Sequence, residues 1–365
     1  MKVLHVSPFY EPAWGYGGVA RAAAELCRSL TRRGDDITVV TTRLSAQDAA
    51  VESDGGVEIR RFDSPRLMRS WLVPWAPSLG RFLAERASEF DLAHLHGHRN
   101  GLAVTARRRL ERAGIPWVLQ PHGTFPDHAQ FPLAKRVFDA LWGRRTVSGA
   151  SALLAVSRAE ALDLPRASHV VGNGVCSVGV APLPGVQSAH SLLFVGSSRA
   201  QKRGSVLVEL LRELPEATLT LVGRFSSRFL GPFRSFGSRV LINGVLGGDE
   251  LQRAYCAARV VLHPAVGEAF GFVPFEAALA GTPAIVAGGH GCGEWFGAAG
   301  GCVVPPDDLR ALVEATKRRL THPEHGRREA VAVATFARRE LTWDAVAASV
   351  AARYRDVAGL AQADS

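Results

Sequence analysis

Residues 267–283 read GEAFGFVPFEAALAGTP and set two carboxylates, Glu268 and Glu276, eight positions apart across a glycine turn. The turn opens a predicted helix over residues 272–280, because proline is tolerated in a first helical turn and the glycine that follows is suited to end a helix. The start of such a helix offers free backbone N–H groups and the positive end of a dipole, which together suit a phosphate. Carboxylates beside that phosphate can accept hydrogen bonds from hydroxyl groups, so the stretch predicts a sugar nucleotide as ligand.

Two other interpretations of the glutamate pair stay open. One glutamate before a turn and another inside a helix could both be solvated surface residues. A hydrolytic acid and base pair would need carboxyl groups about 5 to 9.5 Å apart, whereas eight residues of continuous helix span about 12 Å. The intervening turn could shorten that distance, so the spacing weakens the hydrolase interpretation without excluding it.

The length and composition indicate an ordinary globular protein of two domains. The chain has 365 residues, more than one hydrophobic core usually organises, with 47% hydrophobic and 21% charged residues. The apolar run at the N-terminus is short and interrupted by Pro8, unlike a signal peptide. No apolar stretch reaches the length of a membrane span. A cytoplasmic location is therefore expected.

The cysteines and the net charge restrict the partners. The five cysteines are scattered and form no CxxC pair, which predicts reduced thiols and no zinc site. The net charge of +9 favours an anionic partner. No zinc finger, RNA-binding aromatic motif or basic tail favours nucleic acid, so nucleic acid is not an expected partner.

Short apolar runs alternate with amphipathic segments, as in parallel sheets covered by helices on both faces. The alternation predicts two doubly wound Rossmann-like domains facing each other across a cleft. We expect an N-terminal domain over residues 1–178, to which a C-terminal helix at about 346–362 returns, and a C-terminal domain over 188–345. The Pro-, Gly- and Ser-rich stretch 176–190 is the expected hinge. Predicted helices include 19–33 and 135–147.

Doubly wound sheets bind ligands at the carboxyl ends of their strands, and several informative loops fall there. The loop 12–18 carries three glycines and opens a helix. His122 and Gly123 follow the predicted strand that ends at Gln120. The loop 197–204, with Arg199, Lys202 and Arg203, follows the first strand of the second domain.

Motifs along nearly the whole chain resemble family 4 of the retaining glycosyltransferases, also called glycosyl transferases group 1, which have the two-domain GT-B fold. The likeness includes the Gly17-Gly18 loop, Asp91 to His96, Gln120 to Gly123, Val156-Ser157, Asn173 to Val175, Phe194 to Gly196, Lys202, Leu221 to Gly223, the Glu268 and Glu276 element, and Gly281 to Pro283. Trp343 and Tyr354 lie in a segment that crosses back to the first domain in this family. The glutamate element is specific in this setting, whereas the glycine loop alone would be weak.

The resemblance implies roles for individual residues. Glu276 would hold the donor ribose, and Glu268 would lie near the donor sugar or diphosphate. Lys202 would balance the charge that accumulates on the leaving diphosphate, and Gly17 and Gly18 would let backbone approach the donor. The remaining implied site residues are His122 at the sugar, Arg199 near the phosphates, and Phe270, Gly271 and Phe272 in the donor loop.

The resemblance also implies the chemistry. A hexose-type unit would move from a nucleotide diphosphate sugar to a hydroxyl acceptor with retention, without a metal or another cofactor. The acceptor would be a saccharide or a lipid-linked glycan in cell-surface polysaccharide synthesis. Two alternatives remain: a sugar-nucleotide epimerase of the same fold, and a catalytically silent protein that binds nucleotide sugars.

Several positions depart from the family pattern. Ser197 stands where an arginine usually contacts phosphate, so Arg199 or Arg203 would have to supply the charge. Ala269 replaces a common glycine, a mild change. Arg224 and Arg259 replace aspartates. These departures affect the expected phosphate contacts more than the fold.

Two further segments suggest sites outside the motifs. His94, His96 and His98 alternate, so in a strand they would face one side and could resemble metal ligands. A packing or acceptor role for His96 is the favoured interpretation, and no metal is expected.

Residues 65–86 mix arginines with Trp71, Trp75 and other apolar side chains. That mixture suits peripheral contact with an anionic membrane face, and equally suits a helix that packs its tryptophans on the sheet.

Overall fold

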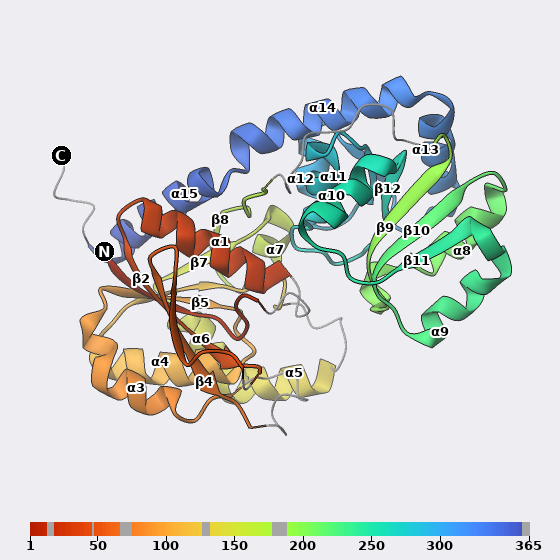
Figure 1. Ribbon diagram of the computed structural model, residues 1–365. Helices are drawn as coiled ribbons and strands as arrows, with labels where there is room; N and C mark the ends of the chain where they lie inside the picture. Colours follow the sequence, from red (N-terminus) through yellow and green to blue (C-terminus); the bar gives the residue numbers. More distant parts are fainter. Residues whose placement is uncertain (13–17, 46, 66–74, 126–131, 177–187, 360–365) are drawn as a thin grey trace. The chain divides into compact units, whose positions relative to one another are not determined.

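The computed structural model describes residues 1–12, 18–45, 47–65, 75–125, 132–176 and 188–359. The chain divides into two compact units, each with its own sheet and core (Figure 1). Unit 1 consists of Met1–Gly174 together with Trp343–Ser365, and unit 2 is Val175–Thr342. Among the described residues, no helix has both the length and the apolar character needed to cross a bilayer.

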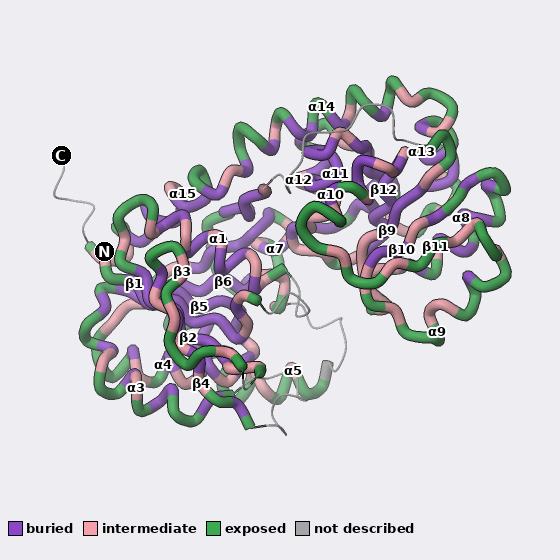
Figure 2. The backbone as a smooth tube through the Cα atoms, in the orientation of Figure 1, coloured by how far each residue is buried: buried purple, intermediate pink, exposed green. Residues whose placement is uncertain are grey.

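Unit 1 contains an eight-stranded sheet in the order β3-β4-β2-β1-β5-β6-β7-β8. Neighbouring strands are parallel except at one edge, where β3 pairs antiparallel with β4. The strands are β1 (Lys2–Val6), β2 (Asp36–Arg43), β3 (Val51–Asp54), β4 (Val57–Asp63), β5 (Leu92–His96), β6 (Trp117–Gln120), β7 (Ala152–Ala155) and β8 (His169–Val170). The central strands β5 and β6 are buried along their whole length (Figure 2), as expected for parallel strands covered on both faces.

Helices connect these strands, and capping residues fix where several of them begin. The helices of unit 1 are α1 (Gly18–Arg32), α3 (Leu79–Arg86), η2 (Ala87–Glu89), α4 (Gly101–Ala113), α5 (Pro132–Phe138), η3 (Asp139–Gly143), α6 (Arg144–Ser148), α7 (Arg158–Asp163) and α15 (Trp343–Val357). The Asn100 carboxamide oxygen accepts a hydrogen bond from Ala103 N at 2.8 Å and starts α4. Ser157 starts α7 in the same way, accepting from Glu160 N at 3.1 Å. These caps place the loops that precede the helices at the carboxyl ends of β5 and β7.

Unit 2 contains six parallel strands in the order β11-β10-β9-β12-β13-β14. The strands are β9 (Ser191–Ser197), β10 (Thr218–Arg224), β11 (Val240–Asn243), β12 (Val260–His263), β13 (Ala284–Ala287) and β14 (Cys302–Val304). The helices are η4 (Ala200–Lys202), α8 (Val206–Glu213), α9 (Ser227–Leu230), η5 (Gly231–Arg239), α10 (Gly248–Ala257), α11 (Val273–Leu279), α12 (Gly291–Ala298), α13 (Leu309–Thr321) and α14 (Pro323–Glu340). The core of this sheet includes Leu192, Phe194, Leu262 and Ile285.

The C-terminal helix α15 belongs to unit 1, where it lies beside α1 (Figure 1). Asp344 in its first turn accepts a hydrogen bond from the Ser29 hydroxyl of α1. Gly174 meets Trp343 where the chain leaves and re-enters the unit. A Cβ on Gly174 would lie 2.4 Å from Trp343 Cδ2, so a side chain at this position would displace the indole.

The fold class predicted from the sequence, two doubly wound parallel-sheet domains, is confirmed. The prediction did not include β3, a four-residue edge strand that is half-exposed and shows no apolar alternation. The helix predicted over 135–147 needs correction, because it begins at Pro132 and includes a π-helical turn over Asp139–Gly143. In that turn Asp139 accepts hydrogen bonds from the Arg99 guanidinium, a tertiary contact that no local pattern indicates.

Candidate active site

The glycine turn before α11 is fixed by a close contact with α12. Gly271 has a φ of 78°, and a Cβ there would lie 2.5 Å from Cys292 Sγ. Only glycine meets both conditions without strain. On either side of it, Phe270 is buried and packs on Phe275 with ring centroids 5.5 Å apart, and Phe272 packs edge-on against Phe270. Phe270, Gly271 and Phe272 therefore shape the turn through packing.

Glu276 lies in α11, a helix whose residues are nearly all buried, and is 3% exposed. The Tyr255 hydroxyl of α10 donates a hydrogen bond to Glu276 Oε2 at 2.8 Å. Burying a carboxylate is costly unless hydrogen bonds compensate for the lost water. Tyr255, which the sequence did not single out, holds the carboxylate in one orientation.

Lys202 and Glu268 form an ion pair at the carboxyl ends of β9 and β12. Lys202 ends the 3-10 turn η4, and the adjacent Gln201 accepts a hydrogen bond at its carbonyl from Val266 N at 2.8 Å, which ties the two loops together. Burial opposes ionisation of Glu268, but the attraction of the Lys202 ammonium outweighs it and lowers the pKa of Glu268 from 4.5 to about 2. Glu268 is therefore a carboxylate at neutral pH.

Two histidines, His263 and His290, lie near this ion pair. Sequence reasoning assigned a role to neither of them. His263 ends β12 and is buried; burial, reinforced by the Lys202 ammonium, lowers the pKa of His263 to about 3. His290 lies in the glycine-rich loop after β13, where its Nε2 is 2.8 Å from the Ala265 carbonyl and its Nδ1 is 3.2 Å from the Glu268 carbonyl. His290 thus ties the loop after β13 to the loop that carries Glu268. The glycine-rich stretch 288–294, which follows a strand, is the signal in the sequence that could have pointed to His290.

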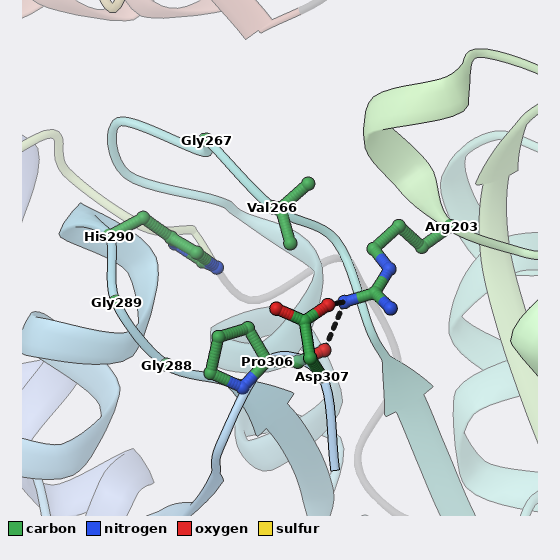
Figure 3. Close-up of a pocket in the computed structure, with 8 residues that line it drawn as sticks. All are labelled: Arg203, Val266, Gly267, Gly288, Gly289, His290, Pro306 and Asp307. Carbon is green, nitrogen blue, oxygen red and sulfur yellow. Dashed lines mark hydrogen bonds and ion pairs between the residues drawn. The ribbon is translucent and has the colours of Figure 1, made fainter. Parts of the chain in front are cut away.

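A pocket of about 420 Å³ opens beside this loop pair (Figure 3). It is lined by Arg203, Val266, Gly267, Gly288, Gly289, His290, Pro306 and Asp307. The Arg203 guanidinium donates to the Pro306 carbonyl and forms an ion pair of 2.9 Å with Asp307 Oδ1. The wall therefore combines backbone, an imidazole and a cation whose charge is already paired, a mixture that suits a polar ligand.

The basic residues after β9 differ in what they contact. Ser197 is the last residue of β9 and carries no charge. Arg203 is held by Pro306 and Asp307, whereas Arg199 is exposed and no described residue forms an ion pair with it. Of the two arginines that the sequence offered in place of an arginine at Ser197, Arg199 has the charge that is not already neutralised.

The predicted site residues of unit 1 fall in two loops. Gly17 lies outside the described residues, and Gly18 is the first residue of α1. His122 follows β6 with a φ of 54°, a left-handed backbone that is uncommon for residues other than glycine. The Glu160 carboxylate accepts hydrogen bonds from Gly123 N and from Val156 N, the latter at 2.7 Å. These contacts hold the loop in its strained conformation.

The three alternating histidines do not share one environment. His94 and His96, both on β5, stack with ring centroids 4.2 Å apart on the face that also carries His5. His98 lies beyond the end of the strand, where it faces Phe125 and lies 3.5 Å from Asp139. The expectation that all three would share a face is wrong for His98, because the strand ends at His96.

Two family models match the chain in sequence order. Residues 17–178 match the model described as "Glycosyl transferase 4-like domain", and residues 189–322 match "Glycosyl transferases group 1". Among curated relatives, the D-inositol 3-phosphate glycosyltransferase of Xylanimonas cellulosilytica is 28% identical, over 96% of this chain and 94% of the relative. The enzyme of the same name from Kineococcus radiotolerans is 29% identical, over 96% of this chain and 93% of the relative.

Solved structures with the same fold cover nearly the whole chain. Sucrose-phosphate synthase from Thermosynechococcus elongatus aligns with a TM-score of 0.82 at 20% identity, over 98% of both chains. The Anabaena protein HepE, solved in complex with UDP-glucose, aligns with a TM-score of 0.78 at 18% identity, over 98% of this chain and all of that one. Both likenesses support the assignment of two Rossmann-like units.

Proposed function

Because the chain belongs to the GT4-type glycosyltransferases of the GT-B fold, we propose that it moves a hexose-type sugar from a nucleotide diphosphate sugar to a hydroxyl acceptor with retention. The observation that carries the proposal is the Lys202 and Glu268 ion pair at the carboxyl ends of β9 and β12, beside the pocket of unit 2. A parallel sheet binds its ligand at this edge. The UDP-glucose complex of HepE makes UDP-glucose the first donor to test.

In this proposal, different charged groups of unit 2 bind different parts of the donor. Lys202 stabilises the negative charge that develops on the leaving diphosphate, and exposed Arg199 supplies a second cation. Glu276, oriented by the Tyr255 hydroxyl, accepts hydrogen bonds from the ribose hydroxyls. Glu268 fixes Lys202 in place before the donor arrives and contacts the sugar end. In unit 1, Gly18 lies at the start of α1 and His122 meets the sugar.

Transfer proceeds without an obligatory metal in this proposal. The acceptor hydroxyl attacks from the face that the diphosphate leaves, and a phosphate oxygen takes its proton, so no protein nucleophile is required. Lys202 and Arg199 then provide the positive charge that a divalent cation would otherwise supply. The buried state of Glu276 and the pairing of Glu268 with Lys202 also leave these carboxylates poorly placed to bind a cation together.

The acceptor is a saccharide or a lipid-linked glycan, and we place the membrane contact on α5, η3 and α6. Leu133, Val137 and Leu141 recur every four residues and are 75%, 50% and 58% exposed. Trp142 is 37% exposed beside them. Four basic residues, Lys135, Arg136, Arg144 and Arg145, lie in the same segment. We call the four apolar and four basic residues the α5–α6 surface.

This surface has the composition of an interfacial helix that lies on anionic lipid, with apolar side chains for the acyl boundary and cations for the headgroups. The segment 65–86, which the sequence also suggested for membrane contact, stays a prediction. Residues 66–74 of that segment lie outside the described residues, and Phe82 packs partly buried against the core of unit 1. Trp75 is 42% exposed, but only as a single residue.

A direct test begins with thermal shifts on a panel of nucleotide diphosphate sugars, since a ligand of the folded state raises its apparent stability. The donor that stabilises the protein is then incubated with and without simple hydroxyl acceptors, and the sugars and nucleotides are separated by chromatography. Acceptor-dependent release of the nucleoside diphosphate together with a new glycoside supports the proposal. A new sugar isomer without an acceptor would identify an epimerase, and binding without turnover would identify a silent sugar-nucleotide binder.

A further inference from the structure

Four histidines and one tyrosine of unit 1 are joined end to end by hydrogen bonds. His122 Nε2 lies 2.9 Å from His96 Nδ1, and His96 Nε2 lies 3.0 Å from His5 Nδ1. The Tyr354 hydroxyl continues the chain, 3.3 Å from His5 Nε2 and 2.7 Å from His94 Nδ1. His5, His94, His96 and Tyr354 are fully buried, and His122 is half-buried at the loop end. We call these five residues the histidine relay.

All four imidazoles of the relay are neutral at pH 7. Burial lowers the pKa of His5 and of His122 to about 3. Burial, together with the neighbouring histidines, lowers the pKa of His94 and His96 well below 6.5. No carboxylate of the described residues acts on these four pKa values in the opposite direction. A neutral imidazole has one N–H donor and one bare nitrogen.

Because the buried Tyr354 hydroxyl must also donate its own proton to one of the two histidines beside it, this constraint leaves the relay only two fully hydrogen-bonded states. If His122 Nε2–H donates to His96 Nδ1, then His96 Nε2–H must donate to His5 Nδ1, and His5 Nε2–H must donate to the Tyr354 oxygen. The Tyr354 hydroxyl then donates to His94 Nδ1, and His94 carries its proton on Nε2. In the other state every donor and acceptor is reversed. The tautomer of His122 is therefore coupled to residues on β1, β5 and α15.

Gln120 at the end of β6 selects between the two states. Its Oε1 and the Nε2 of His94 are both buried, and neither has a partner within hydrogen-bond distance among the described residues. A carboxamide oxygen can only accept a hydrogen bond, so a proton on His94 Nε2 would supply the donor that Gln120 Oε1 lacks. In that state His122 donates through Nε2 and keeps Nδ1 bare.

We propose that the histidine relay locks His122 in the Nε2–H tautomer, so that its bare Nδ1 accepts a hydrogen bond from a hydroxyl of the donor sugar. His5, His96 and Tyr354 are then positioning residues for His122. The proposal rests on the role given to His122 in the proposed function. It is supported by the strained backbone at His122, which is held from the other side by Glu160 through Gly123. No described residue forms a hydrogen bond with His122 Nδ1.

A metal ion is the other group that this cluster could hold. One nitrogen of each of His5, His94 and His96 lies within 4.8 Å of the others. A coordinating imidazole directs its lone pair in the ring plane toward an ion about 2.0–2.1 Å away. The His94 and His96 rings are stacked at 4.2 Å with planes only 20° apart, so their planes do not meet at that distance. The observed geometry fits hydrogen bonds between neutral rings.

Nitrogen NMR tests the tautomer without requiring activity. In protein labelled with 15N-histidine, long-range 1H–15N correlations distinguish the Nε2–H from the Nδ1–H form, and the spectrum of His122→Gln identifies the His122 signals. We expect the native protein to show the Nε2–H form. Tyr354→Phe keeps the ring but removes the hydroxyl, and Gln120→Met removes the selecting acceptor. Each should produce a mixture of both His122 tautomers. Tyr10→Phe, which removes a buried hydroxyl outside the relay, should leave the spectrum of His122 unchanged.

Calorimetry tests the consequence for ligand binding. Tyr354→Phe should weaken UDP-glucose binding by roughly tenfold, the value of about one hydrogen bond, and leave UDP binding unchanged. General loss of structure would weaken both ligands. Failure of the native protein to bind either ligand would contradict the proposed donor, whereas the NMR spectra would still decide the relay. An Nδ1–H form in the native protein, an unchanged His122 signal in both relay variants, or stoichiometric binding of Zn²⁺ that His94→Gln abolishes would overturn the inference.

Discussion

The Lys202 ammonium is paired with the Glu268 carboxylate across 66 positions of sequence, at the carboxyl ends of two adjacent strands. The pair is partly buried, with about a quarter of each side chain exposed. A diphosphate bound at this edge would compete with Glu268 for the same cation. In the proposed function, the ion pair would position Lys202 before the donor binds, and breaking the pair would cost part of the donor's binding free energy. Two substitutions separate these effects.

Lys202→Ala should lower kcat by roughly 100- to 1,000-fold, because a positioned charge that stabilises the leaving diphosphate is lost. Steady-state transfer assays at saturating donor measure this change. Lys317→Ala is the matched control, since Lys317 is an exposed lysine of α13 that pairs with Glu314 at the surface. Native turnover in Lys202→Ala would shift the role to Arg199.

Glu268→Gln should tighten UDP binding by about fivefold. The substitution removes the Glu268 charge and so frees the Lys202 ammonium to bind phosphate. The attraction between two opposite charges about 4 Å apart is roughly 1 kcal/mol in water, and this is the free energy that UDP no longer has to overcome. Titration calorimetry with UDP provides the affinity. Weaker UDP binding in this variant would mean that Glu268 itself contacts the nucleotide.

Tyr255→Phe should weaken nucleotide binding by roughly tenfold or more, because the lost hydrogen bond is made to a charged group. The phenol donates to Glu276 Oε2 at 2.8 Å in a buried environment, so its removal leaves the carboxylate poorly oriented for the ribose. Calorimetry with UDP and with the 2′-deoxy analogue checks the assignment. If Glu276 holds the ribose, the variant should discriminate less between the two ligands than the native protein does.

Acid should destabilise unit 1 through the histidine relay. The folded-state pKa of His5 and His122 is about 3, below the ordinary 6.5, so protons bind preferentially to the unfolded chain between these values. The stabilisation is complete above pH 6.5 and decreases as the pH falls toward 3, by at most about 1.4 kcal/mol per pH unit for each histidine. Thermal unfolding from pH 7.5 to pH 5 should show a falling Tm. His322→Asn, at an exposed position, should show the same pH dependence.

The candidate-site residues that the sequence indicated are those that belong to a local sequence pattern. Glycines in the turn before α11, the two glutamates and Lys202 stand in a recognisable order, and alternating apolar runs indicated both parallel sheets. Tyr255, His263 and the partners of His96 are separated from their contacts by long stretches of chain. Their roles depend on which strands are neighbours, as with β1 beside β5, and strand order is a tertiary property.

The position of Ser197 and the three alternating histidines are two more cases in which a tertiary contact decides what the local sequence pattern leaves open. The sequence offered Arg203 as an alternative to Arg199, and the contacts of Arg203 with Asp307 and with the Pro306 carbonyl distinguish the two. His94, His96 and His98 alternate regularly, yet β5 ends at His96 and sends His98 to Asp139. A regular spacing predicts a shared face only as far as the strand extends.

Membrane attachment should depend on the α5–α6 surface. Leu133→Gln/Val137→Gln/Leu141→Gln should abolish flotation with vesicles that contain anionic lipid, because it removes most of the exposed apolar area. Arg144→Gln/Arg145→Gln should weaken flotation in a salt-dependent way, by about 1 kcal/mol for each charge. Val331→Gln, an exposed apolar position of α14 that is 64% accessible, is the matched control. Equal flotation of the triple variant and the control, or no flotation of the native protein, would exclude this surface as the site of attachment.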